Sequence, residues 1–284
     1  MDRKKYNGKL EAVIFDWAGT TVDFGCFAPT GVFIEVFRQK GIEITQSEAR
    51  GPMGIHKREH IRTITKYPRI DVEWQKKYGE KCTEKDIDEM FDIFIPLQLS
   101  VLEDHSELIP ELPEALKIIR SLDMKIGSTT GYNNEMISIL TAAAARQGYV
   151  PDSVVCATDV PAGRPAPWMA FRNAEKLGIY PMQAILKIGD TISDIEEGIN
   201  AGMWSVGVVK SSNEMGLTHR EIEKIDKADL DKRITQVRNT FIHAGADFVI
   251  DSLSEIGGLI NRINAKLGKG EKPGANKMSG FLLR

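Results

Sequence analysis

Acidic residues stand directly after two short apolar runs, a position from which carboxylates can do chemistry. Asp16 follows the run 10–15, and Asp190 follows the run 184–188, with Asp194 one helical turn later. A carboxylate can act as a nucleophile toward phosphorus, and carboxylate oxygens are the ligands that Mg²⁺ prefers. The structural alternative is that Asp16 caps a turn, while Asp190 is the N-cap and Asp194 a first-turn acid of a helix.

A lysine in another part of the chain could supply a second kind of nucleophile. Lys57 follows a Gly-Pro-Met-Gly loop and shares one face of a predicted helix with His60 and Ile61. A lysine that is desolvated, or close to another cation, has a lowered pKa and can attack a carbonyl carbon. The structural alternative is an ordinary solvated lysine, which is the usual state of this residue.

The same segment also fits a zinc motif. His56, Glu59 and His60 follow the pattern H-x-x-E-H, in which two histidines could hold Zn²⁺ with the glutamate as a base. A pattern with three fixed positions arises easily by chance. A zinc peptidase is therefore a remote alternative, and it would leave the strand-end acids without a role.

Six short apolar runs alternate with helical stretches and must position these groups. The runs are 10–15, 124–129, 153–157, 184–188, 204–209 and 247–250. This alternation predicts an α/β fold: a Rossmann-like parallel sheet core with helices on both faces. Ligands of such sheets bind outside the carboxyl ends of the strands. We therefore expect Asp16, Thr130 and Asp190 to converge.

Residues 26–104 show helical spacing and no strand signal. We expect an inserted α-helical cap domain there, about the size of a small domain, which carries Lys57. The core domain then comprises residues 1–25 and 105–284. Within it, residues 218–243 are expected to form one charged surface helix, and the basic, glycine-rich stretch 266–277 to be frayed.

Composition excludes several classes of protein. Of the 284 residues, 42% are hydrophobic and 27% are charged, and the net charge is −3, so neither gross disorder nor a nucleic-acid partner is expected. The three cysteines, Cys26, Cys82 and Cys156, are scattered and odd in number, which favours a reducing compartment over a disulfide scaffold. No apolar run is long enough for a membrane span. We expect a cytoplasmic protein without a membrane partner.

Four motifs occur in the order of the haloacid dehalogenase superfamily, and the chain resembles that superfamily over nearly its whole length. They are DWAGTTVD from Asp16, STTG from Ser128, GRP from Gly163 and GDTISD from Gly189. The resemblance implies that Asp16 is the nucleophile and becomes an aspartyl phosphate, and that Thr130 and Arg164 hold the phosphoryl oxygens. It also implies a Mg²⁺ site made by Asp16, the carbonyl of Ala18 and Asp190, with Asp194 in support.

Ala18 departs from the pattern of phosphatases in this superfamily, which carry a second aspartate two positions after the nucleophile to protonate a leaving alkoxide. An enzyme without that acid either works poorly on esters or has a leaving group that needs no such proton. Carbon–phosphorus cleavage next to an aldehyde meets this condition if Lys57 forms an imine, because the fragment then leaves as a neutral enamine. Imine formation by Lys57 would thus account for the absence of an acid at position 18.

Further segments resemble the family of phosphonoacetaldehyde hydrolases. They are PMGxxKxxHI around Lys57, KIGSTTGY from Lys125, ATDVPAGRPAPWM from Ala157, NEMGL from Asn213 and GADFVIDS from Gly245. The resemblance implies a Mg²⁺-dependent hydrolase that converts a small-molecule phosphonate to acetaldehyde and orthophosphate through a Schiff base on Lys57. It also implies a homodimer that forms through the cap domains.

The resemblance further implies a set of residues around the substrate: Cys26, Met53, Gly54, His60, Gly131 and Tyr132. His60 is the first candidate for the proton shuttle, since its ordinary pKa is near neutrality, and Tyr132 is the second. Two further alternatives stay open. They are a phosphomonoesterase of the same fold, which Ala18 disfavours, and a non-catalytic binding module.

Overall fold

The sheet is parallel and six-stranded, as the alternation of runs predicts. A computed structural model describes residues 6–274 of the chain, and its strands lie in the order β3-β2-β1-β4-β5-β6. The strands are β1 (Ala12–Phe15), β2 (Lys125–Thr130), β3 (Ser153–Cys156), β4 (Ile185–Gly189), β5 (Trp204–Val208) and β6 (Phe248–Ile250). Phe15, the last residue of β1, is in register with Ser128 of β2 and Ile188 of β4. The predicted fold class is confirmed.

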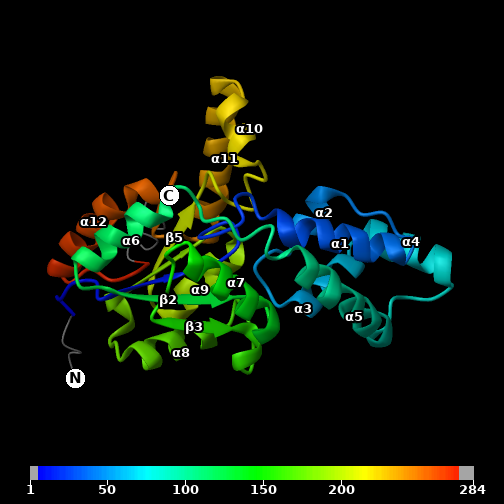
Figure 1. The fold of residues 1–284 in the computed structure, drawn as a ribbon, viewed down its shortest axis with the longest axis horizontal. Helices are drawn as coiled ribbons and strands as arrows, with labels where there is room; N and C mark the ends of the chain where they lie inside the picture. Colours follow the sequence, from blue (N-terminus) through cyan, green and yellow to red (C-terminus); the bar gives the residue numbers. More distant parts are fainter. Residues whose placement is uncertain (1–5, 275–284) are drawn as a thin grey trace, which may run out of the picture.

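Helices cover both faces of the sheet (Figure 1). Alternate residues of β1 explain this, because Val13 and Phe15 pack in one hydrophobic cluster and Ala12 and Ile14 in another. The first cluster includes residues of α6, α7 and α12, and the second includes residues of α8 and α9. The helices are α6 (Leu112–Ser121), α7 (Asn134–Arg146), α8 (Trp168–Leu177), α9 (Ile192–Ala201), α10 (His219–Lys224), α11 (Lys227–Ala244) and α12 (Ile256–Gly268). Short 3₁₀ turns occur at Ala157–Asp159, Met182–Ala184 and Leu253–Glu255.

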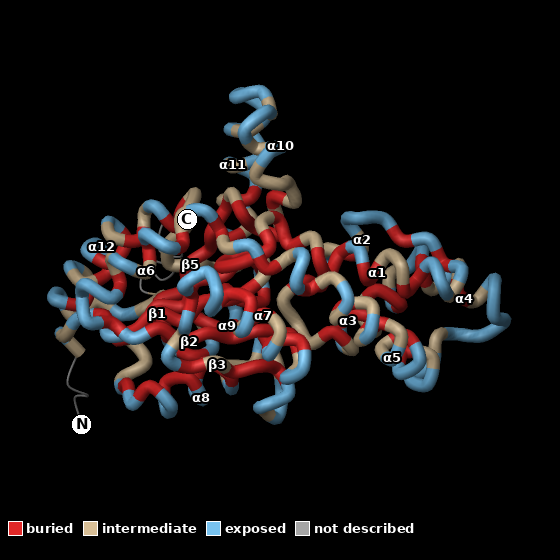
Figure 2. Tube along the Cα trace, viewed as in Figure 1, coloured by how far each residue is buried: buried red, intermediate tan, exposed pale blue. Residues whose placement is uncertain are grey.

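The segment inserted after β1 is helical, as expected. Figure 1 shows its helices gathered at one end of the molecule, away from most of the sheet, and Figure 2 colours parts of these helices as buried. They are α1 (Phe27–Gln39), α2 (Gln46–Arg50), α3 (Lys57–Thr65), α4 (Pro68–Tyr78) and α5 (Glu84–Val101). We call this group the cap. Its division from the core at residues 26 and 104 stays a prediction.

Two expectations about the second half of the chain are wrong. Residues 218–243 form two helices, α10 and α11, because Ile225 is extended and Asp226 caps the second helix through its side chain. The two helices form an arm that projects from the core (Figure 1). The stretch expected to fray from Lys266 begins as the last turn of α12, and Lys266 pairs with Glu271 at 2.6 Å. Residues 275–277 lie outside the described residues.

The described residues contain neither a disulfide nor a candidate membrane span. Cys26, Cys82 and Cys156 are all free thiols. Between residues 6 and 274, none of the helices has the length and apolar character needed to cross a bilayer.

Candidate active site

Three buried carboxylates meet at the carboxyl ends of β1 and β4. Asp16 follows β1, Asp190 follows β4, and Asp194 lies in the first turn of α9. One oxygen of each lies within 4.8 Å of the others, and all three residues are buried. The N-cap of α9 is Thr191, so the expectation that Asp190 could serve as that cap is wrong. The side chain of Asp190 can therefore take part in the cluster of three carboxylates.

Two buried cations hold these carboxylates in place. Arg164 Nη1 lies 2.7 Å from Asp16 Oδ1 and 3.1 Å from Asp194 Oδ1, and its Nε donates to Glu197 at 3.0 Å. Lys187, in the middle of β4, donates to Asp194 at 2.7 Å and lies 3.4 Å from Glu197. Buried charges need such partners to offset their desolvation. Arg164 therefore orients the acids in addition to any role toward a phosphoryl group.

Negative charge remains in excess at this site. Four carboxylates, those of Asp16, Asp190, Asp194 and Glu197, face the two cations Arg164 and Lys187. Burial and the charge of Asp194 raise the pKa of Asp16, and burial and Asp16 raise the pKa of Asp190 well above its usual value. A divalent cation would relieve this repulsion, and the donors are the hard oxygens that Mg²⁺ prefers. The residues present therefore fit a divalent metal.

Lys57 faces these acids from the cap. It is the first residue of α3, and only 5% of its surface is exposed. Its Nζ lies 4.8 Å from the ring centroid of Tyr132 and 3.9 Å from Met53 Sδ. Burial lowers the pKa of Lys57, although the charge of Asp16 opposes the shift. A larger share of this side chain is therefore the free amine at neutral pH than in a solvated lysine.

His60 lies one turn further along α3, and its ring is stacked on Phe33 with the centroids 3.7 Å apart. Its Nε2 contacts the carbonyl oxygen of Ala49 at 2.8 Å, and Nδ1 is buried without a partner. Because a carbonyl only accepts, Nε2 carries the proton. Burial and the charge of Lys57 lower the pKa of His60 well below its usual value, so the ring is neutral.

One loop of the cap docks directly on the core. Ser193 Oγ donates to the carbonyl oxygen of Met53 at 3.0 Å, and Arg164 Nη1 donates to that of Gly54 at 3.2 Å. Gly54 has φ +91°, and a Cβ built on it would lie 2.2 Å from Ser193 Oγ. Glycine is thus required here both by the backbone conformation and by the close approach.

A cavity lies between the cap and the strand ends, with about 260 Å³ of space that atoms do not fill. It is lined by Asp16, Ala18, Cys26, Met53, Gly54, Lys57, Thr130, Gly131, Tyr132, Arg164, Asp190 and Thr191. The structure thus brings together most of the residues that the sequence singled out. His60 and Asp194 do not line the cavity: His60 stacks on Phe33, and Asp194 is paired with Arg164 and Lys187.

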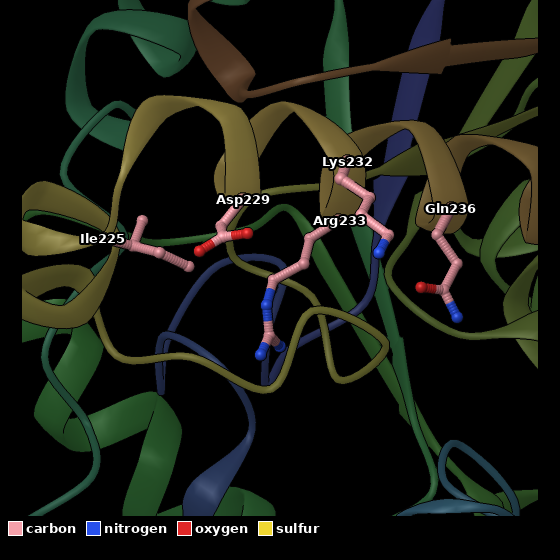
Figure 3. Close-up of a pocket in the computed structure, with 5 residues that line it drawn as sticks. All are labelled: Ile225, Asp229, Lys232, Arg233 and Gln236. Carbon is pink, nitrogen blue, oxygen red and sulfur yellow. The ribbon is translucent and has the colours of Figure 1, made fainter.

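Pocket size does not identify the active site in this molecule. A larger hollow, about 740 Å³, lies on the arm (Figure 3). Its residues lie on α11 or just before it, far in the chain from every strand-end acid. They are Ile225, Asp229, Lys232, Arg233 and Gln236. None of them is one of the three clustered carboxylates, so the smaller cavity, which contains Asp16 and Asp190, is the candidate active site.

The zinc-peptidase alternative is contradicted by the geometry. His60 is bonded to a backbone carbonyl, His56 Nδ1 accepts from the N–H of Arg58, and Glu59 pairs with Arg62. Within residues 6–274, the one group of acids, histidines or cysteines placed to hold a metal is Asp16, Asp190 and Asp194.

Comparison with known proteins agrees with this site. Residues 10–202 match the haloacid dehalogenase-like hydrolase family. A phosphonoacetaldehyde hydrolase of Bacillus cereus (strain B4264) is 49% identical over 255 residues, which are 90% of this chain and 97% of that protein. The chain belongs to the phosphonoacetaldehyde hydrolase family of haloacid dehalogenase-like hydrolases. It is therefore a hydrolase.

Two further relatives agree. The crystal structure of a phosphonoacetaldehyde hydrolase-like protein from Oleispira antarctica superposes with a TM-score of 0.94 at 40% identity, covering 96% of this chain and 99% of that one. A bifunctional phosphonoacetaldehyde hydrolase/aminoethylphosphonate transaminase of Clostridioides difficile is 48% identical over 261 residues. That match covers 92% of this chain and 41% of the longer protein.

Sequence reasoning missed the buried residues that support the acids. Lys187, Glu197 and Thr129 were not singled out, yet Thr129 Oγ1 accepts from Arg164 at 2.6 Å and lies 3.1 Å from Glu197 Oε2. Lys187 carried a usable signal, because it is a charged residue within a short apolar run. Such a residue is rarely buried without a carboxylate partner, and Asp194 is one turn into the next helix.

The contact at Gly54 yields a first prediction. Gly54→Ala is expected to lower kcat/KM by about 100-fold, since misplacing a catalytic group by about 1 Å has an effect of that size. The added methyl group would push the loop and Lys57 away from Ser193. Gly79→Ala is the matched control, because Gly79 also has a positive φ, +79°, but a Cβ there meets nothing within 4 Å. Equal activity of the two variants would contradict the docking argument.

Proposed function

We propose that this hydrolase cleaves the carbon–phosphorus bond of phosphonoacetaldehyde to give acetaldehyde and orthophosphate. The observation that carries the proposal is that Lys57 and Asp16 line the same cavity, in which position 18 is alanine. A lysine amine activates an aldehyde, and a carboxylate accepts a phosphoryl group. The names of the similar proteins support the same substrate.

Lys57 acts first in the proposed reaction. Its amine adds to the aldehyde carbon, and water leaves with the uptake of one proton, which gives a protonated imine. The low exposure of Lys57 favours this step, because burial lowers the pKa of the amine, which increases the share of its free form, and excludes competing water. The imine places an electron-accepting group next to the carbon that bears phosphorus.

Asp16 then attacks phosphorus on the side opposite the carbon. The carbon–phosphorus bond breaks, its electron pair forms the enamine on Lys57, and phosphorus becomes bonded to an Asp16 oxygen. Arg164 and Thr130, which line the cavity, would hold the phosphoryl oxygens. Mg²⁺ held by Asp16, Asp190 and the Ala18 carbonyl would neutralise phosphoryl charge. Because no alkoxide departs, no acid is needed at position 18.

Two steps complete the cycle. The enamine takes a proton at carbon and is hydrolysed to acetaldehyde, and water cleaves the aspartyl phosphate. Tyr132 lines the cavity beneath Lys57, and burial raises its pKa well above the usual value, so it keeps its proton. The pKa of His60 lies well below its usual value, and its Nδ1 has no hydrogen-bond partner. This arrangement favours Tyr132 over His60 as the group that contacts the substrate.

The cellular setting is part of the proposal. A transaminase is fused to the relative from Clostridioides difficile, and transamination of an aminoethylphosphonate would produce the aldehyde. This relative supports a role in phosphonate catabolism. The free thiols support the cytoplasm as the location. We further propose a homodimer that forms through the cap.

A substrate assay tests the proposal. Purified enzyme supplied with phosphonoacetaldehyde and Mg²⁺ is expected to release acetaldehyde and phosphate in equal amounts. Chelation of the metal should stop both, because the excess charge of the acids would then repel the substrate. Release of phosphate from p-nitrophenyl phosphate at a comparable kcat/KM, with no acetaldehyde from the phosphonate, would instead identify a phosphomonoesterase.

A further inference from the structure

A second docking point between cap and core involves residues outside the catalytic cavity. Arg50, the last residue of α2, donates through Nη1 to the carbonyl oxygen of Gly25 at 2.6 Å. The same nitrogen lies 3.2 Å from Asn213 Oδ1 and 3.3 Å from its carbonyl oxygen. Asn213 Nδ2 returns a hydrogen bond to the carbonyl oxygen of Arg50 at 3.2 Å. The two residues are thus joined in both directions.

Asn213 also contacts Asp190, one of the acids proposed to hold the metal. Its backbone N–H donates to Asp190 Oδ2 at 2.8 Å, while Thr20 Oγ1 donates to Oδ1 at 3.2 Å. These two bonds orient both oxygens of a carboxylate that is completely buried. A movement of the loop that carries Asn213 would therefore change the position of Asp190.

The loop that carries Asn213 is hydrogen-bonded to the core and to the chain that leads into the cap. Arg50 of the cap also contacts this loop. Ser211 Oγ donates to the carbonyl oxygen of Gly19, and the N–H of Gly25 donates to the carbonyl oxygen of Ser211. Gly25 lies in the chain that leads into the cap. Arg50 thus ties three segments together, and its guanidinium lies over the ring of Phe27 with 4.8 Å to the centroid. These contacts form where the cap rests on the core.

We infer that Arg50 and Asn213 are positioning residues, a latch through which docking of the cap sets the geometry of Asp190. The inference rests on the proposed function only for its kinetic readout. When the cap is docked, Arg50 holds Asn213 and the Asn213 N–H holds Asp190. When the cap is open, Arg50 leaves with it and Asp190 loses a fixed donor. Because Arg50 and Lys57 both belong to the cap, Asp190 has both of its donors only while Lys57 is also at the cavity.

This arrangement has a use in the reaction. The metal and Asp16 belong to the core, whereas the imine forms on the cap. A latch that joins cap docking to the metal ligands makes phosphoryl transfer depend on the presence of Lys57. The enzyme would then act poorly on phosphate compounds that bind the core while the cap stays open.

The test compares Arg50→Met with Arg69→Met. Arg69 is also a cap arginine, and its partners Glu48, Glu73 and the carbonyl of Glu43 all belong to the cap. Arg50→Met is expected to lower kcat/KM by about 10- to 100-fold, the loss typical of hydrogen bonds made by a charged group. Arg50→Lys should keep part of the kcat/KM that Arg50→Met loses, because a single nitrogen of Arg50, Nη1, makes all three of its hydrogen bonds to Gly25 and Asn213. Asn213→Ala combined with Arg50→Met should lose little more than either alone.

Two measurements do not depend on turnover. Calorimetric titration with Mg²⁺ in the presence of inorganic phosphate is expected to give several-fold weaker binding in Arg50→Met than in Arg69→Met. Amide hydrogen exchange of residues 51–57 should be faster in Arg50→Met. If both quantities match the control while both variants are folded, the latch is wrong. If they shift but phosphonoacetaldehyde is not cleaved by the wild type, the proposed function fails and the latch stands.

Discussion

Lys57→Arg is expected to abolish the turnover of phosphonoacetaldehyde. The loss should be roughly 10⁴-fold or more, as when a covalent catalyst is removed from other enzymes. Arginine carries a positive charge on a side chain at least as long as that of lysine, but its guanidinium cannot form an imine with an aldehyde. The variant therefore separates the charge of Lys57 from its chemistry.

The environment of Lys57 predicts how the reaction with an aldehyde responds to pH. Burial among the rings of Phe33 and Tyr132 lowers the pKa of Lys57. The amine form is thus present at a lower pH than in an ordinary lysine, and imine formation should persist as the pH falls toward neutrality. An exposed lysine would react with the same aldehyde only at higher pH.

Trapping with borohydride measures this directly. Reduction in the presence of substrate should attach the two substrate carbons to Lys57, as read by mass spectrometry of the digested protein. Lys66→Arg is the matched control, because Lys66 is exposed at the end of the same helix and should keep both activity and labelling. Normal turnover of Lys57→Arg, or labelling at other lysines alone, would refute the Schiff base.

The sequence predicted the sheet because its strands leave a strong pattern. The strands within runs 10–15 and 184–188, Ala12–Phe15 and Ile185–Gly189, are buried on both faces and lie at the centre of the sheet. The helix expected over 218–243 failed for a local reason. Charged residues on both sides of Ile225 continue the helical pattern, whereas Asp226 accepts from the N–H groups of Ala228 and Asp229 and starts a new helix. Composition does not distinguish an aspartate inside a helix from one that caps the N-terminus of a helix.

The site was predictable to the extent that chemistry dictates residue type. Carboxylates at strand ends and a lysine after a tight loop have few structural reasons to occur together, so Asp16, Asp190 and Lys57 stood out. Residues that act through others have no such signature. Asn213 reaches Asp190 with its backbone N–H, which every residue except proline could supply. Its role depends on the loop conformation, which only the folded chain defines.

Asp16→Asn carries the second large prediction, a loss of activity of roughly 10⁴- to 10⁶-fold, because an amide cannot replace the attacking carboxylate. We expect the same change to stabilise the metal-free protein. Burial and Asp194 raise the pKa of Asp16 above its unfolded value. An acid shifted in this direction stabilises the folded state at low pH, and the contribution is lost as the pH rises through the folded pKa. At neutral pH its charge therefore opposes folding.

Removing that charge leaves the cations satisfied. Arg164 keeps Asp194 and Glu197, and Lys187 keeps the same two partners. If the relief is about 1 kcal/mol, the metal-free Tm should rise by about 2–4 °C in a chain of this size. Mg²⁺ should raise the Tm of the wild type more than that of Asp16→Asn, since a ligand carboxylate has been lost.

Thermal unfolding with and without Mg²⁺ checks both statements. Asp159→Asn is a suitable comparison, because Asp159 is not one of the three clustered carboxylates. It accepts a hydrogen bond from the N–H of Cys156. It should not raise the metal-free Tm. A metal-free Tm of Asp16→Asn below that of the wild type would mean that the Asp16–Arg164 pair stabilises the fold. The strand-end acids would then be a structural network first, and their mutual repulsion would not prepare the site for a divalent cation.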